Sequence, residues 1–244
     1  MVGDPVPLRI SDRLFLRGES DLDLGVGVAR PVPAGQRVWA QGFRPFELQL
    51  PAPGIGLARL GLKSGWASRL GADSMARYLL AEMQREGVDC SRVVCDPQQR
   101  TGMLFKGRVT DGSDPPVEYH RKGSAASQMQ PADIDEGWLR GARHLHSTGV
   151  FAAISDNCFE VSRKTMRLMR EAGRSVSFDT NLRPSLWSSA ELMRQRVNEL
   201  AFAADWVFPG LDEGRQLTGE TTPEAIAAFY RAYGASLVAV KLGA

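Results

Sequence analysis

The sequence predicts an α/β protein with a doubly wound, mostly parallel sheet and a small β hairpin that stands off it. From residue 55 onward, helical patterns alternate with short apolar runs, so successive strands require right-handed crossovers and helices on the sheet faces. The runs at 103–109 and 117–122 are instead joined by a turn-rich segment, which predicts the antiparallel hairpin.

The elements follow in order along the chain. Residues 1–54 are rich in Pro and Gly and predict no regular core strand. Residues 73–86 predict a helix, with Met75, Tyr78, Leu79 and Met83 on one face and Gly87 as its stop. Strands are expected at 93–95, 103–109 and 117–122. Beyond them, helices at about 133–141, 156–172, 190–203, 212–218 and 222–233 alternate with strands at 144–148, 175–179, 206–208 and 237–241.

Length and composition fit one large domain, with or without a small appendage: 244 residues, 43% hydrophobic and 24% charged. A net charge of +2 without any Lys/Arg-dense run argues against a nucleic-acid partner. No apolar run approaches the ~20 residues of a membrane helix, so no membrane partner is expected. Cys90, Cys95 and Cys158 include no C-x-x-C pair, and we expect them as apolar fillers in the reducing cytoplasm.

Polar residues gather where the strands of the predicted parallel sheet end. Ligands of such sheets bind beyond the carboxyl ends of the strands. The clusters are Thr148-Gly149, 179–183, 210–213 and 241–243. One such cluster would be an ordinary loop, but four at the same edge suggest one shared site.

Asp179, Asn181 and Arg183 are spaced two apart after the strand at 175–179. If the chain stays extended there, all three side chains face the same way, into one cleft. An arginine fork suits a carboxylate or phosphate because it binds two oxygens at once. A capped loop with a surface arginine explains the triplet equally well.

The hairpin presents a second candidate set. Tyr119 and Arg121 share one face of its second strand, whereas Glu118, His120 and Lys122 take the other. An exposed hairpin with solvated charges is an equally good interpretation.

Three weaker signals remain. Gly210 and Glu213 open the helix at 212–218, whose free N–H groups would attract phosphate while Glu213 held Mg²⁺ through water. Glu in a first helical turn is also ordinary dipole chemistry. Lys241 and Gly243 at a strand end would allow close approach of a nucleotide. His144 and His146 point the same way within a strand, but no third ligand has suitable spacing. We therefore favour structural roles for His120, His144 and His146 over a metal site.

Taken together, these residues resemble the ribokinase-like (PfkB) carbohydrate kinases, most closely the 2-keto-3-deoxygluconate kinases. The resemblance covers about residues 55–244. It rests on Gly56-Leu-Ala-Arg-Leu-Gly-Leu followed by Ser68-Arg-Leu-Gly-Ala-Asp-Ser, on Glu118-Tyr-His-Arg-Lys-Gly-Ser-Ala-Ala-Ser, on Phe178-Asp-Thr-Asn-Leu-Arg-Pro-Ser-Leu-Trp, and on Gly210-Leu-Asp-Glu-Gly-Arg-Gln-Leu-Thr-Gly.

The resemblance implies ATP-dependent phosphorylation of 2-keto-3-deoxygluconate to the 6-phosphate, with Mg²⁺. A lid hairpin at about 101–122 would place Tyr119, His120 and Arg121 over the sugar acid. Thr148 and Gly149 would contact it, and Arg183 would hold its carboxylate. Glu213 matches the glutamate of the family's N-x-x-E motif, linked to Mg²⁺, and Gly210 stands where that motif has Asn. The expected nucleotide contacts are Asn181, Gly210, Lys241, Gly243 and Ala244.

Two departures from the family pattern lead to further expectations. Residues 1–54 do not show the family's opening strand or its sugar-binding glycine segment, so we expect an atypical N-terminal segment before the kinase domain at 55–244.

The family's Gly-Ala-Gly-Asp motif, which carries the catalytic base, is not found in the 244 residues. The resemblance places that base beyond Ala244, and Asp179 is a poor substitute. We therefore expect a chain that is incomplete at its C-terminus, folds poorly alone and transfers phosphoryl groups inefficiently.

Alternatives remain open at this point. Another kinase of the same fold could act on a neutral sugar or a nucleoside, although Tyr119, Arg121 and Arg183 favour an anion. A non-catalytic sugar-acid-binding fragment is a different class. Lid strands of this family often pair between subunits, which leaves a homo-oligomer open.

Overall fold

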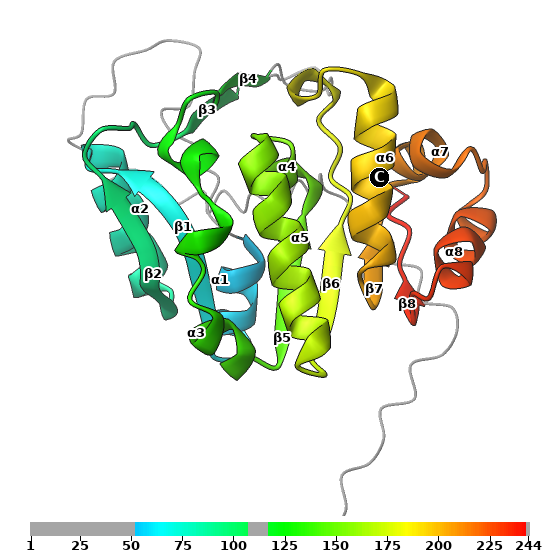
Figure 1. Ribbon diagram of the computed structural model, residues 1–244, viewed down its shortest axis with the longest axis horizontal. Helices are drawn as coiled ribbons and strands as arrows, with labels where there is room; N and C mark the ends of the chain where they lie inside the picture. The colour runs from blue at the N-terminus through cyan, green and yellow to red at the C-terminus, as the bar shows by residue number, and fades with distance from the viewer. Residues whose placement is uncertain (1–51, 107–116, 243–244) are drawn as a thin grey trace, which may run out of the picture.

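The computed structural model describes residues 52–106 and 117–242. Figure 1 shows an α/β arrangement in which helices and parallel strands alternate, with a short hairpin above the strand ends. The described strands form a parallel pair β1-β2, an antiparallel pair β3-β4 and a parallel four-stranded sheet ordered β5-β6-β7-β8. The expectation of an α/β protein with parallel strands and a separate hairpin is confirmed. The described parallel strands are divided between two sheets rather than joined in one.

The first unit comprises α1 (Ala52–Arg59), β1 (Ser64–Gly71), α2 (Ser74–Arg85) and β2 (Val88–Asp96). Helix α2 begins where the Asp73 carboxylate accepts a hydrogen bond from the Ala76 N–H at 2.8 Å. Its buried face contains Ala76, Leu79 and Met83. The expectation that Tyr78 belongs to that face is wrong, because its side chain is 53% exposed.

The hairpin consists of β3 (Met103–Lys106) and β4 (Val117–His120), with Leu104 opposite Tyr119. The part of the expected strand at 107–109 lies outside the described residues. Two 3-10 turns, η1 (Ala125–Gln128) and η2 (Pro131–Asp133), then lead into the larger sheet.

The larger sheet contains the remaining elements. These are α3 (Glu136–Gly141), β5 (His144–Thr148), α4 (Gly149–Ala152), α5 (Asp156–Glu171), β6 (Ser175–Asp179), η3 (Pro184–Leu186), α6 (Ala190–Phe202), β7 (Trp206–Phe208), α7 (Leu211–Thr218), α8 (Pro223–Ala232) and β8 (Leu237–Val238). Strand β8 is shorter than the expected 237–241, although Lys241 still forms an isolated parallel bridge with Gly210.

The core of this sheet lies under α5 and α6, which cover one face in Figure 1. Val176, Phe178 and Val207 are fully buried there against helix residues such as Met166 and Val197. Alternation along the strands puts His144, Ser177 and Trp206 on the other face. None of the described helices is long and apolar enough to cross a membrane.

Candidate functional site

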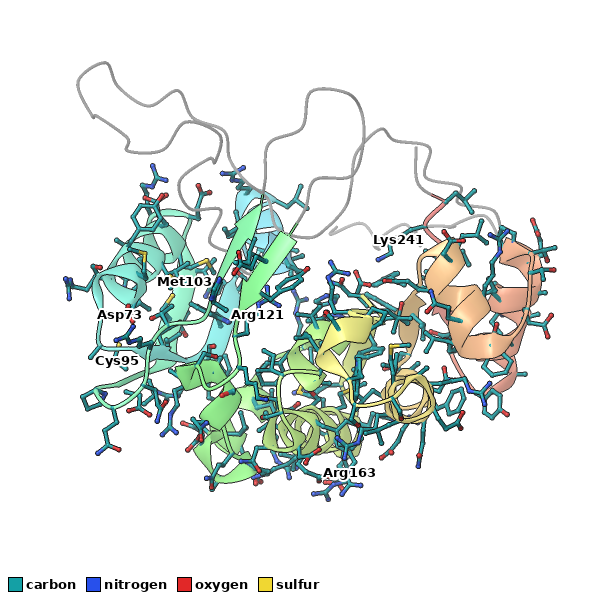
Figure 2. The ribbon with its side chains drawn as sticks, turned by 90° about the horizontal axis from the view of Figure 1, so that it is seen from above. Asp73, Cys95, Met103, Arg121, Arg163 and Lys241 are labelled. Atoms are coloured by element: carbon teal, nitrogen blue, oxygen red, sulfur yellow. The ribbon has the colours of Figure 1, made fainter. Side chains whose placement is uncertain are left out.

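The carboxyl ends of β5, β6, β7 and β8 lie side by side. Thr148 pairs with Asp179 and Asp179 with Phe208, and the Gly210–Lys241 bridge continues this alignment to the end of β8. Figure 2 views this edge from above, with Arg121 at the hairpin and Lys241 beside α7. Parallel pairing thus gathers the polar clusters that follow the strands at one edge of the molecule.

An ion pair between Asp179 and Lys241 joins β6 to the segment after β8. The Lys241 Nζ donates to Asp179 Oδ1 at 2.8 Å, and the carboxylate is only 1% exposed. Burial raises the pKa of Asp179, while the Lys241 ammonium opposes that rise. Lys241 is fixed at its backbone, where its N–H donates to Pro209 O and its carbonyl accepts from Leu211 N.

Two buried polar atoms lie unsatisfied near this ion pair. Asp179 Oδ2 and Thr148 Oγ1 have no hydrogen-bond partner within the described parts of the chain. They belong to paired residues of β5 and β6, and their side chains share one face of the sheet. Unsatisfied buried polar atoms are uncommon in folded proteins, so a ligand hydroxyl or a water is the expected partner.

Gly149 allows β5 to approach the loop after β6. A Cβ at this position would lie 2.0 Å from the Thr180 carbonyl oxygen, closer than any real contact. Glycine is therefore required here by space, at the turn where β5 leads into α4.

Asn181 turns the chain immediately after β6. Its φ is +33°, in the left-handed region, and its N–H donates to Asp179 Oδ1 at 3.1 Å. Asn tolerates this region better than most residues. The expectation that Asp179, Asn181 and Arg183 face one way is wrong, because it required an extended chain. Asp179 instead meets Lys241, and Arg183 meets the hairpin.

Arg183 reaches the hairpin through Tyr119. Its Nε donates to Tyr119 Oη at 3.0 Å, and its Nη1 donates to the Leu182 carbonyl at 2.7 Å. The guanidinium of Arg121 lies over the same tyrosine ring, with Cζ 4.9 Å from the ring centroid. Two arginines from distant parts of the sequence therefore converge on one tyrosine.

His120 is not brought into this group. Its side chain is exposed, and its Nε2 lies 2.9 Å from Glu118 Oε1 on the outer face of β4. Because side chains alternate along a strand, His120 lies on the opposite face of β4 from Tyr119, as the sequence predicted.

Glu213 accepts three hydrogen bonds from the protein. Its Oε2 accepts from Thr180 Oγ1 at 2.6 Å and from Gly210 N at 2.8 Å, and its Oε1 accepts from Leu182 N at 2.8 Å. An ionised carboxylate offers about four acceptor positions, so about one remains. The carboxylate therefore connects the first turn of α7 to the loop after β6.

Among the described residues of this edge, Glu213 is the candidate contact for a metal ion. No three His, Cys, Asp or Glu side chains in the described ranges are grouped closely enough to hold a metal by themselves. Mg²⁺ commonly keeps several waters and binds through one or two carboxylates and substrate phosphates. The remaining acceptor position of Glu213 fits an ion that arrives with a nucleotide.

Sequence reasoning missed Thr180 and the Asp179–Lys241 ion pair. Thr180 is fully buried, and only its contact with Glu213 reveals its importance. The sequence does place Asp179 and Lys241 at the ends of two apolar strands, and this position was the one indication that the two side chains could pair. Gly243 and Ala244, the two remaining nucleotide candidates, lie outside the described residues.

The fold and this edge define an α/β protein with a candidate site at the carboxyl ends of its parallel strands. The model of the pfkB family carbohydrate kinases matches residues 55–244. The 2-dehydro-3-deoxygluconokinase of Bacillus subtilis (strain 168) is 47% identical over 189 residues, which are 77% of this chain and 58% of that protein. The chain belongs to the pfkB family of carbohydrate kinases.

Solved structures agree on a ribokinase-like fold. A PfkB protein from Polaromonas sp. JS666 has 70% sequence identity and a TM-score of 0.75, over 78% of this chain and 64% of that one. An E. coli protein assigned as Ribokinase II, solved in complex with ATP and Mg²⁺, has 26% identity and a TM-score of 0.72, over 85% of this chain and 66% of that one. The chain thus spans less than two thirds of the length of the B. subtilis relative, namely 58%.

Proposed function

We propose that this protein is a sugar-acid kinase that transfers a phosphoryl group from ATP to 2-keto-3-deoxygluconate and gives the 6-phosphate. The observation that carries the proposal is the convergence of Arg183 and Arg121 on Tyr119, with Arg183 Nε 3.0 Å from Tyr119 Oη. Two guanidinium groups beside one tyrosine favour an anionic substrate, because arginine recognises carboxylates through paired hydrogen bonds. The B. subtilis relative, named for a keto sugar acid, supports the same substrate class.

The substrate end of the site would orient the sugar acid. Arg183 would hold its carboxylate while the hairpin, through Tyr119 and Arg121, covers it and excludes water. Thr148 Oγ1, unsatisfied among the described residues, would bond a sugar hydroxyl beside Gly149. Fixing one end of the substrate aligns the reacting hydroxyl at the other end, which is where much of a kinase's rate acceleration arises.

The nucleotide end would lie around Lys241, Asn181 and Gly210, with Gly243 and Ala244 following. The Lys241 ammonium, held by Asp179 at 2.8 Å and partly exposed, would donate a hydrogen bond to a phosphate oxygen of the nucleotide. Mg²⁺, when bound with ATP, would neutralise phosphate charge, with Glu213 as its protein contact. The structure of the E. coli relative with ATP and Mg²⁺ supports these cofactors.

Calorimetric titration tests the substrate class. The wild-type chain should bind 2-keto-3-deoxygluconate in preference to fructose, a neutral sugar. Arg183→Ala should weaken sugar-acid binding by about tenfold or more and leave ATP binding nearly unchanged, because a charge-assisted hydrogen bond contributes ~1.5–3 kcal/mol. Arg77→Ala, on the exposed side of α2, is the matched control.

Two results would overturn parts of the proposal. An equal loss of affinity toward fructose in Arg183→Ala would remove the carboxylate assignment. Binding of fructose by the wild-type chain as tight as its binding of 2-keto-3-deoxygluconate would favour a kinase for a neutral sugar instead.

A further inference from the structure

We propose that Glu213 is a positioning residue for Arg183 and sets the affinity for the sugar acid through the backbone of Leu182, independently of metal or nucleotide. The inference rests on the proposed function, in which Arg183 holds the substrate carboxylate. It adds to Glu213 a role at the opposite end of the site from the phosphates.

A continuous series of contacts carries this inference. Glu213 Oε1 accepts the Leu182 N–H at 2.8 Å, and the carbonyl of the same residue accepts Arg183 Nη1 at 2.7 Å. Arg183 Nε then donates to Tyr119 Oη at 3.0 Å. The backbone of Leu182 is therefore held at both of its polar groups: its N–H by the Glu213 carboxylate, and its carbonyl by the Arg183 guanidinium.

In the loop after β6, the Leu182 N–H donates to a side chain, the Glu213 carboxylate. Asn181 turns the chain into the left-handed region directly after β6, and the pairing of β6 with β7 ends at Asp179. Leu182 is 7% exposed, and a buried N–H without a partner is costly. This N–H donates to the Glu213 carboxylate.

The hydrogen bonds to Glu213 Oε2 fix the position of Oε1, which accepts the Leu182 N–H. Oε2 accepts from Thr180 Oγ1 and from Gly210 N, so the carboxylate is attached both to the loop and to the start of α7. A Cβ at Gly210 would lie 3.2 Å from Oε2, which shows how closely the side chain folds back over this position. Any shift of the first turn of α7 is thereby passed to Leu182 and Arg183.

Glu213→Gln tests the inference while preserving shape. The amide nitrogen cannot accept, so the donors at one of the two oxygens lose their partner. Titration with 2-keto-3-deoxygluconate, without Mg²⁺ and without nucleotide, should show an affinity about tenfold or more weaker. A role limited to metal and phosphate would leave this affinity unchanged.

Two further variants complete the experiment. Asp212→Asn removes a charge from the same helical turn, but Asp212 is exposed and pairs with Arg215 at 2.8 Å, so sugar-acid affinity should stay at the wild-type value. Thr180→Val removes one contact to Oε2 and keeps the fold testable if Glu213→Gln is unstable. It should weaken sugar-acid binding less than Glu213→Gln does.

Amide exchange gives a readout that does not need the ligand. The Leu182 N–H and the Arg183 Nε–H should exchange faster in Glu213→Gln than in wild type and at wild-type rates in Asp212→Asn. Unchanged exchange at both groups would overturn the inference, as would unchanged affinity in a wild type that binds the sugar acid. If the wild type binds no sugar acid, the proposed function fails, and the exchange rates alone decide whether Glu213 positions Arg183.

Discussion

His146 on β5 is a residue whose surroundings control its charge. Its Nδ1 lies 2.8 Å from Ser177 Oγ on β6, and the same hydroxyl lies 2.8 Å from Nε2 of His144. Burial lowers the pKa of His146 to about 4, and the charges of a protonated His144 and of Lys241 act in the same direction. The folded protein therefore keeps this imidazole neutral where an exposed histidine takes up a proton.

Stability should consequently decrease in mild acid. Between pH 6.5, the ordinary pKa, and about 4, the unfolded chain binds a proton at His146 that the folded chain does not. The free energy of unfolding should fall by up to roughly 3 kcal/mol over this range from this group. Urea titrations at several pH values would measure the fall, and His146→Gln should flatten it. An equally steep fall in the variant would assign the acid sensitivity to other groups.

The sequence placed most candidate residues at the correct edge but not their mutual contacts. Thr148, Asp179, Gly210 and Lys241 follow parallel strands, and parallel strands end together, so their proximity was predictable. The turn at Asn181 was not, because a positive φ at one residue depends on the partners that the neighbouring peptides find in the folded protein.

The turn from β5 into α4 is an element defined by close backbone approach. Gly149 lies where any Cβ would be 2.0 Å from the Thr180 carbonyl oxygen, and that oxygen belongs to rigid backbone. The loop carrying Leu182 and Arg183 starts at the same place. Packing between two backbone segments thus fixes the height of the loop after β6 above the sheet.

Gly149→Ala should destabilise the protein by about 1–3 kcal/mol, because β5 and the loop after β6 must separate to admit the methyl group. Gly141→Ala, at the end of α3, is the matched control, since a Cβ there meets nothing within 4 Å. The control should be neutral or slightly stabilising. The midpoints of urea unfolding give the comparison, and equal midpoints for the two variants would contradict the close approach.

Among the elements, periodicity identified those with strong apolar patterns. The strands at 144–148, 175–179 and 206–208 and helices α5 and α6 agree with expectation. Strand β1 was missed because its sequence, SGWASRLG, has few apolar or β-branched residues. Its conformation comes from parallel pairing with β2, a tertiary contact that local propensity does not contain. The helices α1 and α4 were missed as well.

At the scale of the whole molecule, the hairpin and the larger sheet meet across the candidate site. In Figure 1 the hairpin lies above the strand ends, and among the described strands β3 and β4 pair only with each other. The hydrogen bond from Arg183 to Tyr119 joins residues 64 positions apart and connects these two parts. The hairpin should therefore respond to a ligand at Arg183.

Removal of this hydrogen bond should loosen the hairpin without unfolding the rest. Tyr119→Phe deletes the hydroxyl and keeps the ring beneath Arg121, so amide exchange in 103–106 and 117–120 should become faster, while exchange in β5 and β6 stays unchanged. Tyr78→Phe, at a tyrosine 53% exposed on α2, is the control and should alter neither region. Addition of 2-keto-3-deoxygluconate should protect the hairpin in wild type and protect it less in Tyr119→Phe. If a bound sugar acid left hairpin exchange unchanged in wild type, the hairpin would not close over the substrate, and Arg183 would act from the sheet side alone.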